Sequence, residues 1–68
     1  MTYLDRLKNE HSELASKLAL LDKFITTEAF LKLATAEAAR LHLQSAIMRQ
    51  YVDVLALRIA FVEESNDE

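Results

Sequence analysis

The strongest constraint on this chain is a run of positions between Leu4 and Ile25 that repeat at alternating intervals of three and four residues. The positions are Leu4, Leu7, His11, Leu14, Leu18, Leu21 and Ile25. An α-helix brings residues with this spacing onto one face, and the spacing is typical of a face that packs against another helix. Thr2 is a candidate N-cap and Asp5 places an acid in the first turn. The pattern predicts a helix over about residues 3–25.

A second long helix is predicted over about residues 36–62, and it carries two such rows of positions. The first row is Leu41, Ser45, Met48, Val52, Leu55, Ile59 and Val62, and the second is Leu43, Ile47, Gln50, Val54, Leu57 and Phe61. One partner helix covers one row, and the chain has one other long helix to offer. The second row therefore predicts contact with another copy of the chain. Its large apolar residues are the expected oligomer interface: Leu43, Ile47, Val54, Leu57 and Phe61.

The segment between the long helices begins with Thr26 and Thr27, whose hydroxyl groups compete with helix continuation by bonding the local backbone. A short helix is predicted over about residues 28–33, with Thr35 as the N-cap of the next helix. We therefore predict an all-α fold for residues 1–62. It is an antiparallel helical hairpin with a short connecting helix, assembled into a homo-oligomeric helical bundle.

Composition supports oligomerisation as the source of stability. The chain has 68 residues and no cysteine, so neither a disulfide nor a thiolate metal site is available. A single core of this size supplies only about 3–5 kcal/mol. His11 and His42 lie on different segments and are too few for a structural zinc site. Glycine is absent, which excludes the glycine-rich phosphate loops, and we expect no cofactor.

The net charge of −3 is concentrated at one end of the sequence. Residues 63–68 carry four acids and no base, and they oppose the dipole of the preceding helix, so we expect a mobile acidic tail. Residues 1–62 carry eight bases against seven acids, which argues against binding to duplex nucleic acid. Apolar runs are at most four residues long, so we expect neither a signal peptide nor a membrane span, and a cytoplasmic location.

Catalysis is not expected from the polar residues of the first helix. His11 occupies a row position otherwise held by leucine or isoleucine, where a polar group more often fixes register or oligomeric state. His42 is expected to be a solvated surface residue. Glu10 and Glu13 share a helix face, but a general acid and base need a concave, dry setting that two helices without long loops rarely form. We therefore predict that the protein is not an enzyme.

Gln44, Tyr51 and Arg58 recur at intervals of seven and fall on one face of the second long helix. An aromatic ring flanked by a guanidinium and an amide can stack a base and clamp a phosphate. The same residues are also typical of the polar border of a helix interface, and the residues themselves favour this second interpretation. In an antiparallel hairpin, residue numbers that sum to about 63 lie at similar heights, which places Lys17 near Gln44 and Met48. The same register places Tyr3 and Arg6 near Arg58. Isolated basic groups in apolar helical walls suit small anions better than duplexes.

The chain resembles a large group of short phage and prophage proteins over nearly its whole length. Their recurring pattern reads E-x-x-E-L-x-x-K-L-x-x-L-x-x-F-I, then F-x-x-L, then L-x-x-Q-x-x-x-M-x-x-Y-x-x-x-L-x-x-R-I. The positions that carry the resemblance are Glu10, Glu13, Leu14, Lys17, Leu18, Leu21, Phe24, Ile25, Phe30, Leu33, Leu41, Gln44, Met48, Tyr51, Val54, Leu55, Arg58 and Ile59. The part that contains Gln44, Met48, Tyr51 and Arg58 is the more specific, because helix packing does not demand those residue types.

The predicted architecture is also similar to that of the helical-hairpin sponges with which phages inhibit CBASS and Thoeris immunity. Those proteins form oligomers and sequester cyclic nucleotide signals between protomers without cleaving them. The resemblance implies an anti-CBASS or anti-Thoeris role in the host bacterial cytoplasm, with a ligand of the cyclic oligonucleotide or cyclic ADP-ribose type. Its implied ligand-binding residues are Lys17, Gln44, Tyr51 and Arg58. The alternative is a helical interaction protein that binds or inhibits a host protein through the second apolar row.

Overall fold

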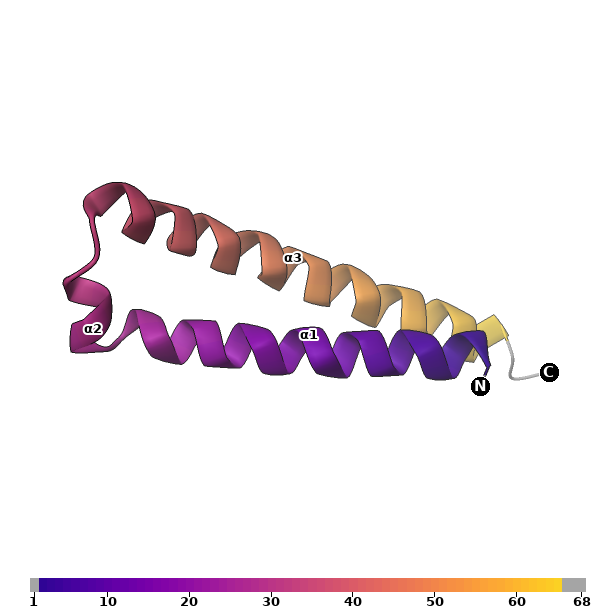
Figure 1. The fold of residues 1–68 in the computed structure, drawn as a ribbon. Helices are drawn as coiled ribbons and strands as arrows, with labels where there is room; N and C mark the ends of the chain where they lie inside the picture. Colours follow the sequence, from indigo (N-terminus) through magenta and orange to yellow (C-terminus); the bar gives the residue numbers. More distant parts are fainter. Residues whose placement is uncertain (1, 66–68) are drawn as a thin grey trace.

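The computed structural model describes residues 2–65 as a helical hairpin (Figure 1). Helix α1 spans Tyr3–Ile25, α2 spans Glu28–Leu31 and α3 spans Thr35–Ser65. Figure 1 shows α1 and α3 side by side in opposite directions, with both termini at one end and α2 at the other. The Cα trace extends over 53 × 16 × 15 Å, so the hairpin is a rod. The prediction of an all-α class is confirmed, since the described residues form helices and no strand.

The start of α1 is fixed by the predicted cap. The Thr2 hydroxyl oxygen accepts a hydrogen bond from the backbone N–H of Asp5 at 3.1 Å, and the Asp5 carboxylate accepts one from the backbone N–H of Thr2 at 3.5 Å. This reciprocal pair is a capping box, which satisfies N–H groups that have no partner within the helix. A cap of this kind stabilises a helix by about 1 kcal/mol.

Two threonines end α1 and begin α2 without any glycine. The Thr26 hydroxyl donates to the Lys23 carbonyl at 2.8 Å, and the Thr27 hydroxyl donates to the Phe24 carbonyl at 2.6 Å. The Thr27 hydroxyl also accepts from the backbone N–H of Phe30 at 3.3 Å, so Thr27 is the N-cap of α2. The hydroxyl groups therefore satisfy backbone groups on both sides of the break.

The bounds of the later helices differ from the predicted ones by a few residues. Helix α2 ends at Leu31, and α3 includes Thr35 as its first residue rather than as its N-cap. Helix α3 also continues to Ser65, past the predicted end at residue 62. The Lys8 ammonium pairs with Glu63 at 3.1 Å and ties this last turn to α1. The predicted mobile tail includes residues 66–68, which lie outside the described residues.

The core forms between the predicted row of α1 and the first predicted row of α3. Leu7 and Leu18 are buried on α1, and Leu55 on α3 is completely buried. Ser45 of the α3 row is also buried, and the remaining members of both rows are half-buried. Helix α2 adds the buried Phe30, whose ring makes edge-to-face contacts with His42 at 5.2 Å and with Phe24 at 6.1 Å between centroids. His42 is exposed, as expected of a solvated residue, but its ring also packs on this cluster because α2 folds back toward α3.

Three polar side chains interrupt the apolar core and fix how the helices align: Asp22, Ser45 and Arg49. We call this cluster the polar node. The buried Ser45 hydroxyl donates to one Asp22 carboxylate oxygen at 2.6 Å, and the Arg49 guanidinium donates to the other at 2.7 Å. These bonds, that from Ser45 first, lower the pKa of Asp22 below its ordinary value of 3.8. Sliding α3 by one turn would leave the buried hydroxyl without its partner, which is unfavourable. The node therefore specifies the register of the hairpin.

Replacing Leu55 by alanine is expected to destabilise the hairpin by about 2–5 kcal/mol, because the substitution leaves a cavity at a completely buried position. The measurement is urea unfolding followed by circular dichroism, at one fixed protein concentration. Leu31→Ala is the matched control, since Leu31 is 80% exposed on α2. If Leu31→Ala lowered the free energy of unfolding as much as Leu55→Ala, the described core would be contradicted.

Asp22 is expected to titrate below 3.8 in a carboxyl-carbon NMR titration. Ser45→Ala and Arg49→Ala should each raise this midpoint, because each removes a hydrogen bond that lowers the pKa of Asp22. Since folding lowers this pKa, the stabilisation from Asp22 is complete above its unfolded pKa. It is lost as the pH falls through the lowered folded value. A midpoint unchanged by Ser45→Ala would contradict the node.

Candidate functional site

One flank of the hairpin carries polar and aromatic residues that face each other across the two long helices. We call this set the cross-helix ladder. Its members recur at intervals of seven, and opposing members have residue numbers that sum to 61: Tyr3, Glu10 and Lys17 on α1, and Arg58, Tyr51 and Gln44 on α3. Seven residues are close to two helical turns, so each set lies along one side of its helix.

We call each opposing pair of the ladder a rung. Two of the three rungs are joined by hydrogen bonds. The Arg58 guanidinium donates to the Tyr3 hydroxyl at 2.7 Å. The Tyr51 hydroxyl donates to the Glu10 carboxylate. Two predicted ligand residues, Tyr51 and Arg58, thus form hydrogen bonds from α3 to α1. Such contacts are expected of residues at the polar border of a helix interface.

The third rung holds the other two predicted ligand residues, Lys17 and Gln44. Lys17 is exposed on α1 at the level of Gln44 in the ladder. The Gln44 amide nitrogen lies 3.7 Å from the Met48 sulfur, within the same helix. The amide is thereby held along α3, and its other polar groups lie at an exposed position.

The ladder contacts alter the titration of the residues that make them. The hydrogen bond to the Glu10 carboxylate raises the pKa of Tyr51 above 10.0, because losing the phenolic proton would place two negative charges side by side. The hydrogen bond to Tyr3 raises the pKa of Arg58, which therefore stays charged at every physiological pH.

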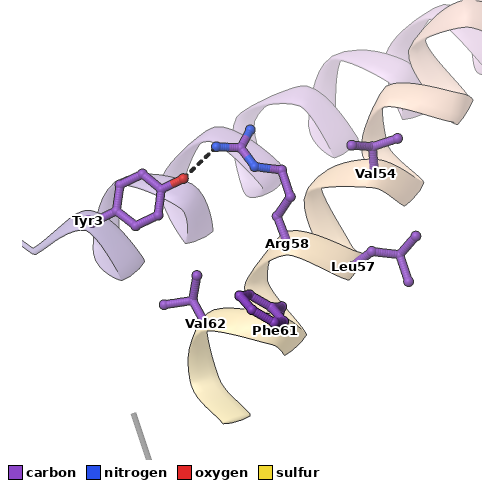
Figure 2. Close-up of a pocket in the computed structure, with 6 residues that line it drawn as sticks. All are labelled: Tyr3, Val54, Leu57, Arg58, Phe61 and Val62. Atoms are coloured by element: carbon purple, nitrogen blue, oxygen red, sulfur yellow. Dashed lines mark hydrogen bonds between the residues drawn. The ribbon is translucent and has the colours of Figure 1, made fainter. Parts of the chain in front are cut away.

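The ladder ends in a cleft at the end of the hairpin that holds the two termini (Figure 2). The cleft has a volume of about 380 Å³ and is lined by Tyr3, Val54, Leu57, Arg58, Phe61 and Val62. Figure 2 shows the Arg58 guanidinium reaching from α3 toward the Tyr3 hydroxyl of α1. The walls are otherwise apolar, so the cleft combines one fixed positive charge with hydrophobic surface.

This combination suits a ligand that has both a flat ring and an anionic group. The Tyr3 ring is 54% exposed and the Phe61 ring is 69% exposed, so both are available for stacking. A guanidinium has five N–H donors, and the bond to Tyr3 uses one donor nitrogen of Arg58. The remaining donors can form bidentate hydrogen bonds to a phosphate. The volume lies in the lower part of the range of about 300–1,000 Å³ that is usual for small-molecule sites.

The cleft draws on both predicted sets of residues. Arg58 comes from the predicted ligand set, and Val54, Leu57 and Phe61 come from the predicted oligomer interface. The antiparallel register expected from the sequence places Tyr3 near Arg58, but Tyr3 is not among the predicted ligand residues, and the structure adds it to the cleft.

The predicted ligand residues do not form one pocket within a single chain. Lys17, Gln44 and Tyr51 do not line the cleft. Gln44 precedes Arg58 by 14 residues, which is about 21 Å along α3. Arg58 is thus the one member of the predicted ligand set that contributes to this cleft.

The second apolar row of α3 is on the surface of the hairpin. We call it the exposed row. Its large side chains are between 48% and 70% exposed. The row runs from Leu43 to Phe61, about 27 Å along the helix, and ends in the cleft. An exposed row of large apolar side chains, here interrupted by Gln50, is typical of an interaction site.

Residues 2–65 contain neither a candidate metal cluster nor a candidate membrane span. This part of the chain brings no three histidine, aspartate or glutamate side chains into a group that could hold a metal ion. Its helices also lack a stretch long and apolar enough to cross a bilayer.

Comparison with known proteins identifies one family. The family model described as Sequestin matches residues 1–61, which includes the whole cleft except Val62. No curated protein and no solved structure matches the chain.

In a Tyr3→Phe background, Tyr51 is the one remaining tyrosine, and its phenol is expected to titrate above 10.0 when phenolate absorbance is followed. Glu10→Gln should lower that pKa, because it removes the negative charge beside the phenol, whereas Glu13→Gln is the control and should not. Because folding raises this pKa, the contact stabilises the hairpin below the unfolded value and this effect is lost as the pH rises through the folded one. If Tyr51 had the same pKa in the Glu10→Gln and Glu13→Gln variants, the hydrogen bond between Tyr51 and Glu10 would be contradicted.

Proposed function

We propose that this chain, which belongs to the Sequestin family, is a phage counter-defence protein that sequesters a cyclic nucleotide immune signal without cleaving it. The ligand site lies at the interface between copies of the chain, in the host bacterial cytoplasm. The family name indicates sequestration, and the resemblance to helical-hairpin sponges supports a cyclic nucleotide as the sequestered molecule.

The observation that carries the proposal is the cleft around Arg58. It places a permanently charged guanidinium among exposed aromatic and aliphatic side chains. A nucleotide presents a phosphate and a flat base within a few ångströms of each other, and these two groups match the two kinds of surface in the cleft. Inorganic anions would use the charge but not the apolar walls.

The chemistry of the cleft favours binding over turnover. Its side chains supply stacking, apolar contact and one hydrogen-bonding cation. Arg58 stays protonated, so it cannot act as a general base. A protein that removes a signal by sequestration needs high affinity and a sufficient number of sites, and neither requirement involves a reactive group.

A second copy of the chain would complete the site. Leu7, Leu18, Phe30 and Leu55 are the buried apolar residues of the described chain, whereas ten large apolar side chains are exposed. A core this small gives little stability by itself. Packing two exposed rows together would cover Val54, Leu57 and Phe61 on the apolar wall of the cleft and exclude water from the ligand, which strengthens its contact with Arg58.

The exposed row also supports the alternative function, in which the chain binds or inhibits a host protein. The two functions differ in the solution state of the purified protein. An oligomer that covers the row with a second copy supports sequestration, whereas a monomer that leaves the row exposed favours a protein partner. Native mass spectrometry distinguishes these states.

Binding is tested by thermal unfolding with cyclic di- and trinucleotides and with cyclic ADP-ribose isomers. A nucleotide present at a hundredfold excess over its Kd is expected to stabilise the protein by about 2.7 kcal/mol. Arg58→Ala should weaken binding roughly 10- to 150-fold, since a hydrogen bond to a charged group contributes about 1.5–3 kcal/mol. Lys8→Ala is the matched control, because it removes a cation from the same end of the hairpin but from outside the cleft.

The fate of the ligand separates sequestration from catalysis. After incubation with wild-type protein and heat denaturation, the nucleotide should be recovered intact and in full. Recovery of a cleaved product would contradict the proposal, as would the absence of any melting shift across the panel.

A further inference from the structure

The exposed row of α3 has the same spacing in both directions. Its successive intervals are four, three, four, three and four residues: Leu43, Ile47, Gln50, Val54, Leu57 and Phe61. If two copies of α3 packed antiparallel about a twofold axis at the level of residue 52, Leu43 would meet Phe61 of the second copy. Ile47 would then meet Leu57, so that each outer layer pairs one large apolar residue with another.

The acidic end and the dipole of α3 favour this antiparallel arrangement over a parallel one. Glu63 and Glu64 lie at the end of the described helix, and Glu63 is paired with Lys8 of the same chain. Parallel packing would bring the two acidic ends together and align the two helix dipoles, both of which are unfavourable.

A twofold axis perpendicular to the helices also brings the ladder flanks of both copies to the same side of the dimer. Arg40 lies on that flank, because it precedes Arg58 by 18 residues, which is five turns of helix. Within one chain these two guanidinium groups therefore leave α3 in the same direction but about 27 Å apart. They cannot bind one small ligand from a single chain.

The dimer brings Arg58 of one copy near Arg40 of the other. Arg40 of the second copy falls at the level of residue 64, six residues beyond Arg58 and about 9 Å along the helix axis. Gln44 of the second copy falls at the level of residue 60, between the two charges. Arg40 is free to reach the cleft because its pair with Glu37, at 3.6 Å, is exposed and such pairs are weak.

From these relations we infer that the chain forms an antiparallel α3–α3 dimer with two composite sites, each made of Arg58 from one copy and Arg40 and Gln44 from the other. Two cations about 9 Å apart along the axis select a ligand with two separated anionic groups, such as the two phosphates of a cyclic dinucleotide. The amide between them is placed to hydrogen-bond a base edge. This inference rests on the proposed function and names the subunit contributions and the ligand class.

The test is complementation between two variants that each lack one arginine. Arg58→Ala and Arg40→Ala homodimers should both bind the best cyclic dinucleotide of the panel at least tenfold more weakly than wild type. After the two variants are mixed and refolded together, half of the dimers are mixed. Each mixed dimer has one site with both arginines and one site with neither. Calorimetry should therefore recover about a quarter of the wild-type sites at wild-type affinity.

The control for complementation mixes Arg58→Ala with the double variant that lacks both arginines, which should recover no sites. Wild-type affinity in the Arg40→Ala variant would overturn the inference, and so would a failure of the mixture to recover any sites. In both cases wild-type binding persists and the proposed function stands. Failure of the wild-type protein to bind any nucleotide would instead overturn the proposed function itself.

The dimer geometry can be tested without ligand, because the chain contains no cysteine. A mixture of Ile47→Cys and Leu57→Cys should cross-link efficiently with a short bismaleimide. Leu57→Cys by itself should not, since its two copies are about 15 Å apart along the axis in an antiparallel dimer. The opposite preference would show a parallel pair and overturn the inference.

Discussion

The structure depends on the register between α1 and α3, and one polar contact in the core sets that register. Ser45 occupies a position in the inward row of α3 where the other residues are apolar, and its hydroxyl is satisfied by Asp22 at 2.6 Å. Apolar rows by themselves pack almost equally well after a shift of one turn, because their spacing repeats. A buried hydroxyl that loses its partner does not tolerate such a shift. The position of Arg58 opposite Tyr3, and thus the cleft, follows from this alignment.

The two apolar rows of α3 differ in what covers them. Its inward row packs on α1 and forms a core with few fully buried residues. Its exposed row has a comparable apolar character but has no helix of the same chain to cover it. In the proposed dimer a second copy covers this row, so stability and ligand binding would be linked through the same surface. Any ligand that bridges two copies would therefore also stabilise the assembly.

Arg58 takes part in two features of the hairpin. One of its nitrogens donates to Tyr3 and thereby holds the end of the hairpin, and its side chain also lines the cleft. Tyr51 differs, because its hydroxyl is committed to Glu10 and its position lies outside the cleft. The interpretation of these residues as a polar helix border describes Tyr51 well, whereas Arg58 lies where the border meets the cleft.

The sequence by itself determined the helices, the cap at Thr2 and the inward row of each long helix, because these depend on local hydrogen bonds and on helical periodicity. It also indicated that the second row of α3 would have no partner within the chain. Only the tertiary structure decided which side chains meet across the hairpin. The numbers of two contacting residues sum to 61 for Tyr3 and Arg58 on one flank of the hairpin but to 71 for Asp22 and Arg49 on the other. The contacts on the two flanks are therefore offset from each other along the helices. Periodicity along one helix contains no information about this stagger, so the expected antiparallel register brought Tyr3 near Arg58 without showing that both side chains line one cleft.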